Sequence, residues 1–177
     1  MPAGDYYPIR EFAGLSLAIM PRPRSGDWLE GEIEQWQREG LNTVLSLLEP
    51  AEVTELELGA EPSLCASHGI EFLSFPIPDR GVPTSITAFD TILAPLVKRL
   101  RAGASVGVHC RAGIGRAGLT AACILVRAGI PYPLAFPAIS RARRVKVPDT
   151  EQQESWVQKF AARPTQQEHQ DARLDST

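Results

Sequence analysis

The segment 108–118 reads Val-His-Cys-Arg-Ala-Gly-Ile-Gly-Arg-Ala-Gly and holds the residues best suited to chemistry in this chain. Cys110 ends a short apolar run that predicts a strand, and a helix is expected to begin near Arg116. A cysteine placed between a strand and a helix faces the unpaired N–H groups and the positive dipole end of that helix, which favour the thiolate. Cys110 is therefore a candidate nucleophile.

The residues after Cys110 can form an anion-binding loop. Gly113 and Gly115 allow the backbone to curl, so that successive amides converge on a point beyond the sulfur. Arg116, six residues after Cys110, can present its planar guanidinium to two oxygens of a phosphate. Such a loop suits phosphoryl transfer. The predicted phosphate-binding residues are Arg111, Ala112, Gly113, Ile114, Gly115 and Arg116.

This segment resembles the protein-tyrosine phosphatase signature, H-C-x-x-G-x-x-R followed by Ser or Thr. His109, Cys110, Gly113 and Arg116 stand at the matching positions. The resemblance implies that Cys110 accepts the phosphoryl group and that Arg116 stabilises the transition state, with no metal and no cofactor. It also implies that His109 supports the loop by hydrogen bonding while its side chain points away from the site.

Two residues outside the loop are further catalytic candidates. Asp79 lies 31 residues before Cys110 in a Pro/Gly loop, where the family carries a general acid that can swing over the site. An ordinary turn aspartate is the alternative interpretation. Gln153, three residues before Trp156, resembles the glutamine that positions the hydrolytic water, with Gln152 as the other choice. A solvated glutamine at a helix start would look the same.

One residue departs from the family pattern, because Ala117 stands where the signature has Ser or Thr. That hydroxyl normally donates to the cysteine sulfur and helps it leave in the second step. We therefore expect reduced turnover and an accumulated phosphoenzyme. Thr120, one turn further on, is expected to bond its own helix and to replace this hydroxyl poorly.

Parts of this pattern also occur in proteins with functions other than phosphate ester hydrolysis. Residues 113–118 also fit G-x-G-x-x-G, but no acidic residue occurs between Gly118 and Pro148, which excludes a dinucleotide fold. A rhodanese- or arsenate reductase-like enzyme would also place a cysteine in such a loop. A phosphate-binding module without activity is favoured by Ala117 alone. Asp79 and the loop spacing favour phosphate ester hydrolysis. Within the phosphatases, a length of about 160 ordered residues suits the compact dual-specificity type, which acts on phosphotyrosine and also on phosphoserine or phosphothreonine in proteins.

Alternating strand and helix patterns place this loop in an α/β fold. We predict a single domain over residues 1–162, with a central, mostly parallel sheet of about four or five strands flanked by helices on both sides. Residues 163–177 form a polar tail with too few apolar residues to pack. The predicted strands are 15–20, 43–48, 70–75 and 105–109, and the predicted helices are 27–39, 51–68 with a break near 59–62, 85–101, 116–128, 133–144 and 150–162.

Composition limits the cellular setting and the partners. The 177 residues contain three cysteines and no apolar run long enough for a membrane span, so we expect a cytoplasmic domain with no membrane partner. The resemblance to the phosphatase family implies a phosphorylated protein or another phosphate monoester as substrate, and no nucleic acid partner. Residues 1–90 carry a net charge of −10 and residues 91–177 carry +7. The basic half suggests an anionic ligand, although a solvated basic face explains it equally well. The same two interpretations apply to the cluster Arg141, Arg143, Arg144 and Lys146.

Overall fold

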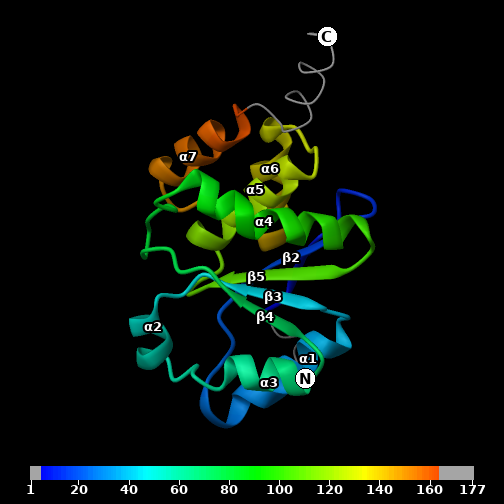
Figure 1. The fold of residues 1–177 in the computed structure, drawn as a ribbon, viewed down its shortest axis with the longest axis vertical. Helices are drawn as coiled ribbons and strands as arrows, with labels where there is room; N and C mark the ends of the chain where they lie inside the picture. Colours follow the sequence, from blue (N-terminus) through cyan, green and yellow to red (C-terminus); the bar gives the residue numbers. More distant parts are fainter. Residues whose placement is uncertain (1–4, 164–177) are drawn as a thin grey trace, which may run out of the picture.

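The computed structural model describes residues 5–163, so the predicted polar tail lies outside the described residues from position 164 onward. Its centre is a five-stranded sheet with the order β1-β2-β5-β3-β4 (Figure 1). β1 pairs antiparallel with β2, and the other neighbours are parallel. The strands are β1 (Tyr7–Ile9), β2 (Ser16–Pro21), β3 (Thr43–Ser46), β4 (Glu71–Ser74) and β5 (Ser105–Cys110).

Helices cover both faces of the sheet, as predicted. In Figure 1, α1 and α3 lie on one face, and α4, α5, α6 and α7 lie on the other. The helices are α1 (Leu29–Arg38), α2 (Pro50–Glu55), α3 (Glu61–Ser67), α4 (Ile86–Arg101), α5 (Gly115–Arg127), α6 (Tyr132–Arg143) and α7 (Glu151–Ala161), with a 3-10 turn, η1 (Gly26–Trp28), before α1.

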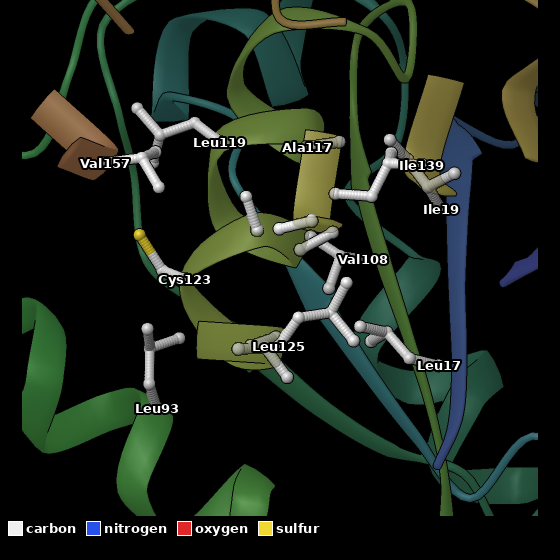
Figure 2. Packing of buried hydrophobic residues seen from close by; sticks show 14 of the residues in the cluster. Leu17, Ile19, Leu93, Val108, Ala117, Leu119, Cys123, Leu125, Ile139 and Val157 are labelled. Carbon is white, nitrogen blue, oxygen red and sulfur yellow. The ribbon is translucent and has the colours of Figure 1, made fainter. Parts of the chain in front are cut away.

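Strand periodicity divides the core into two clusters. Leu17 and Ile19 of β2 face the larger cluster under α4–α7, whereas Met20 faces the smaller cluster under α1 and α3. This alternation follows from the two-residue period of a strand. α5 runs through the middle of the larger cluster, where Ala117 and Leu125 are both fully or almost fully buried (Figure 2).

The α/β fold predicted from the sequence is confirmed, with one strand missed. β1 contains only three residues and includes Pro8, which cannot donate a backbone hydrogen bond. Such a strand is tolerated at a sheet edge, but it carries no alternating pattern long enough to predict. The helix predicted over 51–68 is broken, as predicted, into α2 and α3, although the break lies at 56–60 and thus slightly before the expected 59–62. The first turn of the predicted helix 27–39 is η1.

The sheet register places the candidate nucleophile in the centre of the molecule. Cys110 is the last residue of β5 and pairs with Pro21 of β2, while its neighbour His109 pairs with Ser46 of β3. The carboxyl ends of three parallel strands therefore meet around Cys110, which is where ligands bind in open α/β sheets. No helix in the described part of the chain is long and apolar enough to cross a membrane.

Candidate active site

The loop between β5 and α5 has the curled backbone that its glycines predict. Gly113 has a φ of 65°, and a Cβ atom added there would lie 2.5 Å from the backbone of Met20 and Pro21. Glycine is therefore required for both its conformation and its close approach to β2. Within the described residues, the backbone N–H groups of 111–114 donate no hydrogen bond. Four consecutive donors thus remain free to bind an anion.

Arg116 is buried, and a carboxylate from α2 fixes its orientation. Nη1 donates to Glu52 Oε2 at 2.6 Å and Nη2 donates to Glu52 Oε1 at 2.9 Å, while Nη1 also donates to the Ile77 carbonyl at 3.0 Å. The hydrogen bonds from Arg116 are the main reason why the pKa of Glu52 falls from 4.5 to about 2. The guanidinium is therefore held in one place as a permanent cation.

Asp79 lies beside this guanidinium. Arg116 Nη2 donates to Asp79 Oδ1 at 3.0 Å, and the side chain of Asp79 is 60% exposed. Burial opposes the charge on Arg116, but its bonds to Glu52 and the charges of Cys110 and Asp79 outweigh burial and raise the pKa of Arg116. Asp79 and Arg116 are 37 residues apart in the sequence, yet their side chains meet.

These residues share one cavity of about 180 Å³. Cys110 lies at its base, with 3% of its surface exposed. Because a nucleophile, a fixed guanidinium and an exposed carboxyl group face one small volume, the arrangement can bind a phosphate group and exchange a proton with its ester oxygen. The lining residues are Asp79, Arg80, Cys110, Arg111, Ala112, Gly115, Arg116, Asp149 and Gln153.

Gln153 also lines the cavity, but its amide is already used. Its Oε1 accepts from the backbone N–H groups of Asp149 and Thr150 at 3.1 and 3.2 Å, and its Nε2 donates to the Gly81 carbonyl at 3.1 Å. The first two bonds cap α7, and the third joins α7 to the loop of Asp79. One hydrogen of Nε2 remains for a water or a phosphate oxygen. Gln152, the alternative, is exposed and does not line the cavity.

The loop that carries Asp79 is joined to α7 a second time. Arg80 Nη1 donates to Asp149 Oδ2 at 3.2 Å, and both residues line the cavity. Asp149 thus brings a second carboxylate to the site. The Pro/Gly composition suggested a loop free to swing, whereas two contacts with the start of α7 hold it in this structure.

His109 points away from the cavity, toward α3. Its Nε2 lies 2.9 Å from Glu61 Oε1, both side chains are fully buried, and the Trp36 ring lies 6.2 Å away. The pair is close but not aligned for a hydrogen bond, and the ring donates none to the loop within the described residues. The hydrogen bond that His109 was expected to make to the loop is therefore absent within the described residues, and the ring supports the end of β5 by packing.

Most of the basic residues that could gather an anion instead contact other groups of the protein. Arg111 contacts Glu52 at 3.2 Å and Glu55 at 2.9 Å, so its side chain turns toward α2. Arg141 pairs with Glu11, and Arg143 bonds the loop carbonyls of Ala112 and Gly113. Arg144 and Lys146 are exposed.

Thr120 does not replace the hydroxyl that Ala117 lacks. Ala117 is fully buried on the first turn of α5, and Thr120 is fully buried one turn later. The Thr120 Oγ1 forms no hydrogen bond within the described residues, with its own helix or with any other group. The expectation that Thr120 bonds its helix backbone was therefore wrong.

Two residues of this site were missed by sequence reasoning. Glu52 follows Pro50 at the start of α2, where its Oε2 accepts from the Glu49 N–H at 3.0 Å and forms a capping box. The pattern Glu-Pro-x-Glu predicts that cap, but nothing in it indicates a contact with Arg116, 64 residues later. Asp149 similarly precedes the helix cap Thr150 and carries no signal beyond a helix start.

Comparisons with known proteins agree with this geometry. The family model for the Swiss Army Knife protein, DSP-PTPase phosphatase domain, matches residues 12–174. The chain therefore belongs to this family of dual-specificity and protein-tyrosine-phosphatase-type domains. It is 36% identical over 121 residues to the protein tyrosine phosphatase domain-containing protein 1 of Mus musculus. The aligned region covers 63% of this chain and 16% of that protein. The chain spans only a small part of that relative.

Solved structures share the fold. Kinase associated phosphatase, with its catalytic-site cysteine substituted by serine, aligns with a TM-score of 0.77 and 20% identity over 90% of this chain and 96% of that chain. Tk-PTP in its active form aligns with a TM-score of 0.73 and 25% identity over 90% and 98% of the two chains. This chain is thus a compact phosphatase-type domain, and the rhodanese-like and binding-module alternatives are not favoured.

Proposed function

We propose that this domain hydrolyses phosphate monoesters, phosphotyrosine and also phosphoserine or phosphothreonine in proteins, through a phosphocysteine intermediate. The observation that carries the proposal is the meeting of Cys110, Arg116 and Asp79 at one cavity, beside a loop whose backbone N–H groups at 111–114 donate no hydrogen bond within the described residues. These groups are the nucleophile, the charge-stabilising group and the proton donor that such a reaction needs. No metal or cofactor enters the proposed reaction.

In the first step the Cys110 thiolate attacks phosphorus, an S–P bond forms, and the bond from phosphorus to the ester oxygen breaks. Asp79 gives its proton to that oxygen, which leaves as an alcohol. Phosphate oxygens bind the free amides of the loop and the Nε and Nη2 edge of Arg116, because Glu52 occupies the other edge. Asp79 then exchanges its bond with Nη2 for the leaving group.

In the second step a water molecule attacks phosphorus and the S–P bond breaks, which restores the thiolate. Asp79 takes the proton of that water. Gln153 directs the water with the Nε2 hydrogen that is not bonded to Gly81. Since Cys110 must stay reduced to react, we also propose that the domain works in the cytoplasm.

The test is hydrolysis of p-nitrophenyl phosphate in the presence of EDTA, by the native protein and by Cys110→Ser. Activity of the native protein and none in the variant is expected. The matched control is Cys123→Ser, which removes a buried cysteine that lies outside the cavity. Equal activity of native protein and Cys110→Ser would overturn the proposal, as would a native protein that binds vanadate but releases no nitrophenol.

A further inference from the structure

Arg143 is a residue that the proposed reaction does not use, yet it contacts the anion-binding loop. It ends α6, and its half-buried side chain reaches the outer side of the loop. Nε donates to the Gly113 carbonyl at 3.0 Å and Nη2 donates to the Ala112 carbonyl at 3.0 Å. One planar guanidinium thus bonds two consecutive peptide carbonyls, a geometry that lysine cannot reproduce.

These two bonds determine which way the loop amides point. In a trans peptide the C=O and the following N–H point in opposite directions. With the Ala112 and Gly113 carbonyls turned toward Arg143, the N–H groups of Gly113 and Ile114 must point away from it. Both of these N–H groups are free donors within the described residues.

An edge strand keeps the guanidinium in place. The Arg143 Cζ lies 4.3 Å from the ring centroid of Tyr7 in β1, a distance at which a cation is attracted to an aromatic face. Contacts between α6 and β1 recur along the pair, and Arg141, two residues earlier, pairs with Glu11 just after β1. The short strand β1, which the sequence pattern did not predict, therefore contacts the residue that bonds the loop.

We propose that Arg143, held by Tyr7, is a positioning residue that orients the Gly113 and Ile114 amides for phosphate binding. The inference rests on the proposed function, since it requires the loop to bind phosphate. It assigns no contact between Arg143 and substrate. The residue acts by restricting two peptide planes that could otherwise rotate when the loop is unliganded.

The experiment measures the dissociation constant for inorganic phosphate by calorimetry and the amide NMR shifts of Gly113 and Ile114 on phosphate addition. Arg143→Lys keeps the charge and loses the two-carbonyl geometry, and Arg143→Met loses both. We expect at least tenfold weaker phosphate binding in both variants. We also expect the two amides to lose their phosphate-induced shifts.

Arg141→Met, on the same helix and paired only with Glu11, is the matched control and should bind phosphate within twofold of native. If Arg143→Met does not fold, Arg143→Lys alone decides. Native-like affinity and shifts in Arg143→Lys overturn the inference while leaving the proposed function intact. A native protein that binds no phosphate overturns both.

Discussion

Ala117 is the residue at which this site differs from the phosphatase signature. Arg116 and the candidate nucleophile Cys110 line one cavity, but Ala117 brings no hydroxyl to it, and the buried Thr120 Oγ1 has no hydrogen-bond partner within the described residues. The departing thiolate in the second step therefore lacks a hydrogen-bond donor from this position. Slow release of the phosphoryl group from Cys110 is the expected consequence.

Ala117→Ser should raise turnover about ten- to hundredfold, since a hydrogen bond to a charged group contributes roughly 1.5–3 kcal/mol. The phosphoenzyme present at steady state should fall in parallel. Rapid-mixing kinetics with p-nitrophenyl phosphate measure both quantities. Ala121→Ser, also fully buried on α5, controls for the cost of a hydroxyl in the core and should bring no gain. Unchanged turnover in Ala117→Ser would show that the missing hydroxyl is not what limits the reaction.

The site residues that could be predicted from the sequence are those that lie next to one another in the chain. The residues from Cys110 to Arg116 could be assigned because one strand, one loop and one helix start position them all. Glu52 and Asp149 could not be assigned, because each reaches the site from a distant helix start whose local pattern indicates only a cap. Contacts of this kind depend on how helices pack, which a single sequence does not state.

The loop that carries Asp79 is held in place by contacts with the start of α7. Two contacts link them, Gln153 Nε2 to the Gly81 carbonyl and Arg80 to Asp149. The Pro/Gly composition correctly predicted an irregular loop over 76–83. It gave no information on these contacts, since they come from a helix about 70 residues later in the chain.

Gln153→Ala should lower the free energy of unfolding by about 1–3 kcal/mol, because three backbone groups lose a partner. Hydrogen exchange should become faster in residues 79–82, and turnover should fall as Asp79 loses its fixed position. Gln152→Ala, the exposed neighbour, should change none of these quantities. Equal effects of the two variants on exchange in this loop would contradict the role assigned to α7. A turnover loss limited to Gln152→Ala would assign the water to Gln152 instead.

Over the whole molecule, part of the charge asymmetry of the sequence is paired within the fold. Within the described residues, six arginines of the basic half form ion pairs with acidic residues of the first half. These pairs are Arg99 with Glu71, Arg111 with Glu52 and Glu55, Arg116 with Glu52 and Asp79, Arg127 with Asp90, Arg141 with Glu11, and Arg163 with Asp90. Net charge alone could not separate this pairing from an anion-binding surface.

The pair of Arg116 and Glu52 makes stability depend on pH. The pKa of Glu52 is about 2 in the folded protein and 4.5 ordinarily, so its contribution is complete above about pH 4.5 and is lost as pH falls toward 2. Glu52→Gln should therefore lower the free energy of unfolding by about 3 kcal/mol at neutral pH. The difference from native should shrink steadily below pH 4.5.

Urea unfolding of both proteins at several pH values measures this difference. Glu55→Gln is the matched control, because Glu55 lies on the same helix but pairs at the surface with Arg111, and its effect should be much smaller. A pH-independent loss in Glu52→Gln would mean that packing, and not the ion pair, accounts for the destabilisation.

In the proposed reaction the phosphoryl group passes through Cys110. The most direct test is rapid denaturation of the native protein during turnover of a phosphate monoester, followed by mass spectrometry of its peptides. We expect a phosphoryl group on the peptide that contains Cys110, enriched because Ala117 slows its hydrolysis. Steady product release with no phosphoryl group on Cys110 at any time after mixing would contradict it.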